Sequence, residues 1–325
     1  MKRSQPPVVA VAISFALGLL ALGTPRTAAA EPGPLPAPLV ARPGEAKPVE
    51  WKAQAKGGVL LTTGNSHTTN GSVGASVSRK EGGNKLAVEG ALAYGKSTVQ
   101  APVFGDLANP TNITALEDHT VETTNTWLAR GRYDRFFTEN NTGYAVAQAA
   151  GDKIAGKSFF GGGQLGYSRQ VLKNEMNLVL AELGYDFSYE SYVSQPGKTL
   201  DAVSVHSARI FLGETLKLSA QTGITGNFEA LFNLNKEGKA INVSTNAPGV
   251  DPFKDTRLVG KLGLTTTLLK SLSLSLGFTI KYDQNPAPRP VPSGSPAGTA
   301  YAPDFQPFAQ TVDTLTEATL VYTFL

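Results

Sequence analysis

The sequence predicts an all-β fold, a transmembrane antiparallel up-and-down β-barrel of about 12 strands with short periplasmic turns and long extracellular loops. The clearest evidence is the stretch Ser271–Asp283, in which large apolar residues alternate with small or polar ones. Because successive strand residues point to opposite faces, this strand has one apolar and one polar side. It is longer than the usual strand of about five or six residues and reaches the roughly 9–11 residues that a tilted membrane strand needs.

The same alternation recurs along the chain from Trp51, and the breaks between strands are alternately short and long. Outer-membrane barrels combine an even number of strands with short turns on one side and long loops on the other. Their apolar residues face lipid and their polar residues face the lumen. A secreted β-sandwich or β-propeller is the alternative, but those folds seldom need so many long strands with an unbroken apolar face.

The first fifty residues are expected to lie outside the barrel. Residues 1–30 read as a secretory signal peptide, with Lys2 and Arg3 before the apolar run Val8–Leu22 and three small residues at its end. That run is short for a membrane-spanning helix. Residues 31–50 are rich in proline and predict an extended periplasmic lead-in. The barrel is therefore assigned to residues 51–325.

Composition excludes several other classes of protein. The chain has 29 basic and 26 acidic residues, and the signal peptide holds three of the basic ones and no acidic one. The rest is balanced, which gives no argument for nucleic acid as a partner. The absence of cysteine leaves no site for a lipid anchor or a disulfide framework. No later segment approaches the roughly 20 apolar residues of a membrane helix.

The individual strands are bounded by clusters of turn-forming residues, and each keeps its large apolar residues on one face. Short turns are expected at Glu81–Asn84, Thr138–Asn141 and Lys173–Met176, and long loops at 100–118, 237–254 and 285–307. The expected strands are 51–63, 71–80, 85–99, 119–137, 142–151, 159–172, 177–193, 203–218, 222–235, 255–269, 271–283 and 308–325.

Short motifs carry a family resemblance. Thr63-Gly64-Asn65-Ser66 follows the first strand, and Gly151-Asp152 precedes the glycine-rich segment Gly162–Tyr167. In these features the chain resembles the salt-induced outer membrane proteins (YdiY-like, domain of unknown function 481), which have a T-G-N-T/S signature and a segment ending G-L-G-Y. The resemblance covers most of the chain from Trp51 and weakens in the long loops. It implies an outer-membrane barrel and supplies no catalytic residues.

Charged residues on the polar faces of the strands are candidates for lining the lumen. Buried charges must be paired or hydrated, so a lumen of mixed sign either holds water or is cross-linked by arginine–carboxylate pairs. About eight strands leave only side-chain space and about sixteen leave an open channel, so about twelve allow a narrow pore or a closed plug. We predict the pore. The candidates are Glu89, Glu122, Arg130, Arg132, Asp134, Glu182, Asp186, Glu190, Arg209, Glu229, Lys261, Lys281, Asp283 and Glu317.

Two other motifs have plain structural explanations. Gly161–Gly166 satisfies G-x-G-x-x-G, but no helical pattern follows it, so the glycines are better explained by bending of the wall or close backbone approach. The histidines His67, His119 and His206 fall near the outer ends of strands, where histidine with acids could activate water or bind a metal. Polar residues on a wet rim are the favoured explanation. We predict no catalytic residue, no cofactor and no metal.

The predicted function is that of an integral β-barrel of the Gram-negative outer membrane, either a small passive channel or an envelope barrel connected with stress. The alternatives are a structural or adhesive barrel that presents its loops, and a surface hydrolase at the rim. The expected partners are outer-membrane lipid, small solutes or ions, and the barrel-assembly machinery, which would bind the C-terminal strand ending at Leu325. Nucleic acid is not among them.

Overall fold

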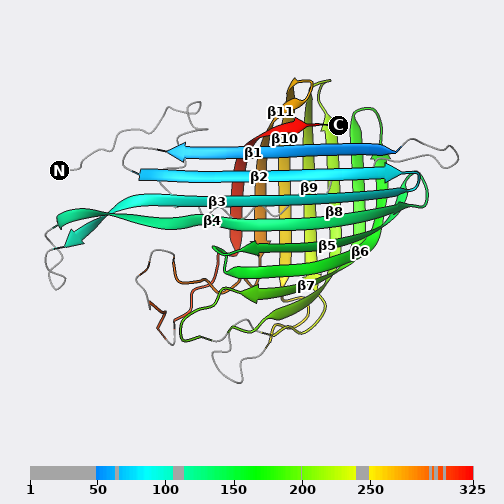
Figure 1. Cartoon of the computed structure of the whole chain (residues 1–325). Coiled ribbons are helices and arrows are strands. Elements are labelled where there is room, and N and C mark those ends of the chain that lie inside the picture. The colour runs from blue at the N-terminus through cyan, green and yellow to red at the C-terminus, as the bar shows by residue number, and fades with distance from the viewer. Residues whose placement is uncertain are drawn as a thin grey trace, which may run out of the picture.

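A computed structural model describes residues 49–62, 66–104, 113–198, 200–238, 249–292, 295, 299–302 and 305–324. Within these residues twelve antiparallel strands close into one barrel, in which each strand pairs with its neighbours in the chain and the last pairs with the first (Figure 1). The strands are β1 (Glu50–Thr62), β2 (Ser66–Glu81), β3 (Asn84–Phe104), β4 (Ile113–Phe136), β5 (Asn141–Asp152), β6 (Lys157–Lys173), β7 (Asn177–Tyr192), β8 (Val203–Lys217), β9 (Thr222–Asn233), β10 (Thr256–Leu269), β11 (Leu272–Asp283) and β12 (Val312–Thr323).

The predicted fold class is thereby confirmed, and so is the alternation on which it was based. On β11 the apolar residues Leu276, Phe278 and Ile280 point away from the lumen and are 46%, 43% and 44% exposed. Ser275, between them, points inward and its hydroxyl lies 3.0 Å from that of Thr265 on β10. Exposed apolar side chains of this kind ring the outer wall, as expected of strands that face lipid.

This register makes a direct prediction for two neighbouring positions of β11. Leu276→Arg should lower the free energy of unfolding in lipid vesicles by about 2–4 kcal/mol, because it places a charge on the lipid-facing side. Ser275→Arg should be tolerated, since the added charge enters the polar lumen. Urea titration of both variants in vesicles measures the difference. Equal losses at the two positions would contradict the assignment of Leu276 to the lipid face and Ser275 to the lumen face.

The segment 100–118 is not a loop throughout, contrary to the sequence-based prediction. β3 continues to Phe104 and β4 begins at Ile113, and the two extensions pair with each other as far as Phe104 and Ile113. They form a two-stranded ribbon that runs beyond the neighbouring strands, to the left in Figure 1. Proline and asparagine suggested an irregular loop, but the ribbon still satisfies its backbone groups across the pair. The motif Thr63–Ser66 falls mostly outside the described residues, as do the predicted signal peptide and all but the last two residues of the lead-in.

Short connections gather at one end of the barrel, between β2 and β3, β4 and β5, β6 and β7, β8 and β9, and β10 and β11. The other end, which we call the mouth, carries the longer connections 193–202, 234–255 and 284–311. Two short connections also lie at the mouth end, 63–65 between β1 and β2 and 153–156 between β5 and β6. No helix in the described residues is long and apolar enough to cross a membrane.

The longest connection folds back across the mouth. The described residues of 284–311, here called the mouth segment, leave β11 and reach the β7–β8 connection and the β5–β6 turn. The β5–β6 turn lies about halfway around the ring of strands. Pro288 is fully buried against Gly156 of that turn. Gln195 donates to the carbonyl of Arg289 at 3.1 Å, and Lys198 donates to the carbonyl of Phe305 at 2.6 Å. The mouth segment is therefore a roof over the lumen.

The ring is closed by an unusually short ladder. β1 and β12 pair only from Gln54 to Gly57, opposite Thr323 to Leu320. Each of the other neighbouring pairs of described strands is joined over many more residues; β10 and β11, for example, pair along nearly their whole length. Beyond Gly57 no further residues of the two strands pair, and in Figure 1 only the C-terminal end of β12 (red) lies beside β1. We call this junction the seam.

Candidate functional site: the barrel lumen

Five charged side chains form a buried layer in the half of the lumen nearer the short turns, here called the inner charge layer. Arg132 on β4 donates from Nε to Asp134 at 2.9 Å and from Nη2 to Glu182 on β7 at 2.7 Å. Arg209 on β8 donates from Nη1 to Glu182 at 2.8 Å and from Nε to Glu229 on β9. Pairs of this kind, with several charge-assisted hydrogen bonds each, offset the cost of removing the charges from water.

A tyrosine supports this layer. Tyr144 on β5 stands beneath the guanidinium of Arg132, whose Cζ lies 4.4 Å from the ring centroid, and its hydroxyl accepts from Arg209 Nη1 at 2.8 Å. The ring lies over Gly166 and Gly184, which are paired across β6 and β7. A Cβ at either glycine would overlap the tyrosine hydroxyl, so the glycines provide the space that it fills. For Gly166 this confirms the prediction of close approach in the glycine-rich motif.

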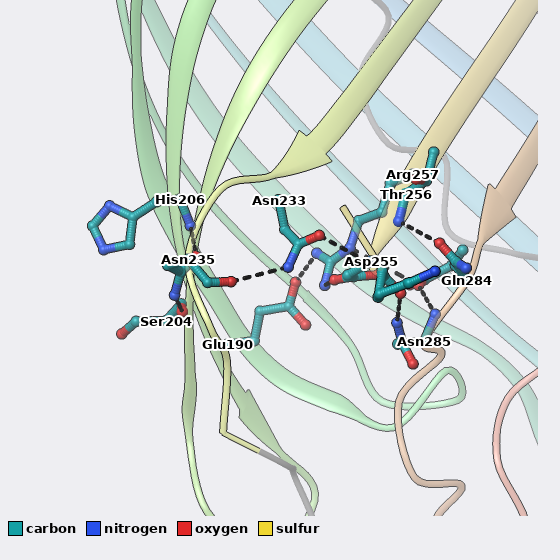
Figure 2. A network of polar contacts seen from close by, with 12 residues as sticks. Glu190, Ser204, His206, Asn233, Asn235, Asp255, Thr256, Arg257, Gln284 and Asn285 are labelled. Atoms are coloured by element: carbon teal, nitrogen blue, oxygen red, sulfur yellow. Dashed lines mark hydrogen bonds and ion pairs between the residues drawn. The ribbon is translucent and has the colours of Figure 1, made fainter. Parts of the chain in front are cut away.

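A second group of charges, the mouth network, lies at the opposite ends of the strands (Figure 2). Arg257 at the start of β10 donates from Nη1 to Glu190 at the end of β7, and from Nη2 to Asp255 at 2.8 Å. Lys157 at the start of β6 lies 3.1 Å from the other oxygen of Glu190. Asp283 lies 3.9 Å from both Lys157 and Arg257. Strands from both sides of the mouth are thereby tied together.

Amide side chains join this network to the mouth connections. Asn233, which is fully buried, accepts from the backbone N–H of Asp255 at 2.9 Å and donates to the carbonyl of Asp251 at 3.1 Å. Asn285 donates to the carbonyl of Lys254 at 2.6 Å, which attaches the mouth segment to the same corner (Figure 2). The β9–β10 connection and the roof are thus held by one set of hydrogen bonds.

Glu237 in the β9–β10 connection is a buried acid at this corner. It is only 5% exposed, and its Oε1 has no hydrogen-bond partner. Burial, followed by the negative charge of Asp255, raises the pKa of Glu237 from 4.5 to about 8. Its backbone forms a two-way bridge with Val250, with N···O distances of 2.9 and 3.0 Å.

The pKa of Glu237 is higher when the β9–β10 connection is folded than when it is unfolded. Between pH 4.5 and about pH 8, folding of this connection is therefore accompanied by proton uptake at the Glu237 carboxyl. The resulting stability is fully present below pH 4.5 and is lost as the pH rises through about 8. We therefore expect the hydrogen-exchange protection factor of the Val250 amide to fall over that range. Glu237→Gln should remove the trend, and an unchanged trend in that variant would assign the effect to another group.

A cavity of about 210 Å³ lies in the lumen between the inner charge layer and the roof. The mouth segment contributes Ala287 and Ala309 to its upper wall. Apolar side chains such as Leu128 and Phe160 lie beside polar ones, so the lining is mixed. Its polar and charged residues include Lys56, Arg130, Gln164, Asp186, Ser188, Ser207, Glu229 and Lys281.

Comparison with known proteins identifies the family. The family model described as "Protein of unknown function, DUF481" matches residues 55–324. The chain belongs to the DUF481 family. The predicted resemblance is confirmed by this match, and a comparison with curated proteins gave no match.

Solved structures that the DUF481 barrel is similar to include three bacterial outer-membrane proteins. The translocator domain of the autotransporter NalP from Neisseria meningitidis has 13% identity and a TM-score of 0.39, over 86% of this chain and 89% of that one. The NanC porin has 8% identity and a TM-score of 0.40, over 84% and 100%. OmpT of Vibrio cholerae has 9% identity and a TM-score of 0.35, over 88% and 100%.

The structure distributes the predicted lumen residues of the DUF481 barrel unevenly. Arg132, Asp134, Glu182, Arg209 and Glu229 meet in the inner charge layer, and Glu190 and Asp283 meet in the mouth network. Asp186 is bonded to Gln164 instead of an arginine, with Nε2 2.9 Å from Oδ1. The remaining ones line other parts of the wall: Glu89 and Arg130, which pair across β3 and β4, and Lys261, Lys281 and Glu317 on β10, β11 and β12.

Glu122 does not share the lumen face of these residues, contrary to the prediction. A bulge at Thr123 shifts the register of β4, so that Glu122 pairs with Lys96 while Thr124 pairs with Gly95. Each bulge adds one residue to a strand and so reverses the faces beyond it. Glu122 accepts a hydrogen bond at 3.1 Å from the hydroxyl of Tyr94, an outward-facing residue that is 46% exposed.

The histidines give no support to a site at the rim. His206 lies on the outer wall, where its ring contacts Tyr185 and Phe187, and its backbone N–H donates to Asn235 at 2.8 Å. His67 and His119 are exposed. Among the residues that the model describes, no group of three or more His, Cys, Asp or Glu side chains is arranged to hold a metal ion.

Sequence reasoning missed several residues of the DUF481 lumen. Arg257, Lys157 and Asp255 complete the mouth network, but they stand at strand ends, where alternation no longer assigns a face. Tyr144 was missed because tyrosine is also common on the lipid side of a barrel. The available signal was its strand partner Gly166, because a tyrosine beside a glycine pair often fills the space that the glycines leave.

Proposed function

We propose that the protein is an integral barrel of the bacterial outer membrane and forms a narrow passive channel for small polar solutes or ions. The observation that carries the proposal is the cavity of about 210 Å³ inside the ring of strands, lined by charges of both signs. A barrel that served only as a scaffold would need no such space, because about twelve strands can be filled by side chains and loops.

The lumen is packed on one side and looser on the other. Inward side chains of β4, β7 and β8 are almost completely buried, with Asp134 and Glu182 at 2% and Arg209 at 1% exposure. By contrast, Lys261, Lys281 and Glu317 on β10, β11 and β12 are partly exposed. Water and solutes would therefore pass along the β10–β12 wall, while the inner charge layer fills the other half. The sequence allowed either a narrow pore or a closed plug. We propose a narrow pore that lies to one side of the barrel axis.

The membrane location rests on the outer wall. Large apolar residues of nearly every described strand are exposed there, for example Leu92 at 59%, Leu183 at 62% and Leu262 at 57%. Such a surface is far larger than the apolar patches of soluble monomers and fits a lipid environment. Export through a signal peptide and insertion by the barrel-assembly machinery, acting on β12, are parts of the proposal. No catalytic activity is proposed.

Single-channel recording in planar bilayers tests the proposal. The refolded protein should give small, discrete conductance steps, well below those of an open porin of sixteen strands. Protein that is folded, as shown by faster migration on unboiled than on boiled gels, but gives no conductance steps would favour the structural barrel instead. A folded protein that stays in the soluble fraction of cells would contradict the membrane location.

A further inference from the structure

One wall of the lumen cavity carries a buried acidic group, Asp186. The two arginines that act on it, Arg257 and Arg209, are bonded to other carboxylates. Asp186 on β7 is 1% exposed and forms no salt bridge with any described residue. Its hydrogen bond comes from Gln164 Nε2 on β6. The Gln164 Oε1 atom is buried and has no hydrogen-bond partner. Buried acceptors of this kind are costly unless a donor reaches them, so Asp186 and Gln164 together fit a positively charged donor such as an ammonium group.

The neighbours of Asp186 strengthen this preference. Glu229 lines the same cavity, and its carboxylate already accepts from Arg209, whose other bonds go to Glu182 and Tyr144. The hydrogen bonds of Arg209 therefore go to the inner charge layer and Tyr144, and none goes to Asp186. Ser188 and Ser207, each 3% exposed, add hydroxyl groups to the same wall. These side chains provide acceptors beside a carboxylate, which is the environment that an amine requires.

A basic group lies on the facing wall. β1 is halfway around the ring from β7, and its Lys56 lines the same cavity. Lys56 lies over Gly74 on β2, where an added Cβ would be 2.8 Å from Lys56 Cε. The glycine therefore lets the lysine stem lie against the wall. A ligand that carries both an amine and an acid would find a group of opposite charge on each wall of this cavity.

We propose that this cavity is a binding site for a small zwitterion, an amino-acid-like molecule with its ammonium group at Asp186 and Gln164 and its carboxylate toward Lys56. The cavity volume of about 210 Å³ suits such a molecule, because pockets for drug-sized ligands run from roughly 300 to 1,000 Å³. This inference names a solute class for the proposed channel and so rests on that function for its biological meaning. The binding itself is measured separately.

Three probes of equal chain length separate the two ends of the site: 4-aminobutanoate, butanoate and butylammonium. Isothermal titration calorimetry with the refolded full-length protein should show tighter binding of 4-aminobutanoate than of either single-charge probe. Asp186→Asn should weaken 4-aminobutanoate and butylammonium by about tenfold or more and leave butanoate unchanged, since one charge-assisted hydrogen bond is lost. Lys56→Met should weaken 4-aminobutanoate and butanoate and leave butylammonium unchanged.

Each variant has a matched control on the same kind of wall. Glu50→Gln also converts a carboxylate on the inward side of β1 to an amide, and Lys52→Met removes another inward lysine of β1, but neither residue lines the cavity. Both controls should bind all three probes normally. Equal affinities for the three probes, or equal losses in variants and controls, would overturn the proposal. Binding without conductance would contradict the proposed channel and support the binding site. Conductance without binding would support the channel and contradict the binding site.

Discussion

Replacing Arg132 by serine is expected to lower the free energy of unfolding by about 3–5 kcal/mol, as removal of one partner from a buried ion pair does. The change leaves Asp134 and Glu182, both 2% exposed, without the guanidinium that they share. Tyr144 also loses the group that stacks on its ring. Urea unfolding of the protein in lipid vesicles measures the loss.

Arg135→Ser is the matched control. Arg135 lies on the same strand but on the exposed outer face, where Nη1 donates to Asn84 at 2.8 Å. Its loss should cost well under 1 kcal/mol, in line with exposed polar contacts. If Arg132→Ser costs no more than this control, water fills that half of the lumen and the packed layer is absent in the membrane.

Gly156→Val is expected to raise the channel conductance several-fold by displacing the roof. Gly156 has a φ of 88°, and a Cβ there would overlap the carbonyl of Pro288 in the mouth segment. The backbone of the β5–β6 turn is tied to the ring, so the mouth segment is the part that must move. Planar-bilayer recording of the variant beside the unmodified protein measures the change.

The control for this prediction is Gly82→Val in the short β2–β3 turn at the opposite end of the barrel. Gly82 has a φ of 53°, but an added Cβ there would meet nothing within 4 Å. Both variants bear a comparable cost of a side chain in the left-handed region. The conductance of Gly82→Val should stay unchanged. Equal conductances of the two variants would show that the roof does not restrict the lumen.

The twelve strands and their faces could be predicted because alternation is a local property that each strand carries in its own sequence. The outward positions of Leu276 and Phe278 followed directly from it. Two errors arose where that local rule fails. A bulge at Thr123 adds one residue without any clear sequence mark, and the flanks of 105–112 pair despite their loop-like composition.

The contacts in the lumen were less predictable because they join strands that are far apart in the chain. Alternation placed Arg132 in the lumen together with acids such as Asp186 and Glu190, but it did not show which acid the arginine would meet. The structure chooses Glu182 instead. That choice depends on how far each strand is staggered against the next around the ring, and alternation within a strand does not contain this information.

The short seam has a kinetic consequence. Each hairpin wall can form from residues close together in the chain, whereas pairing Gln54 with Thr323 must bring the two ends of the barrel together. Compared with the other strand pairings, closure of the ring costs the most loop entropy and forms the fewest hydrogen bonds. We therefore expect ring closure to be the last and slowest step of refolding, and its reversal to be the first step when the barrel is unfolded by force.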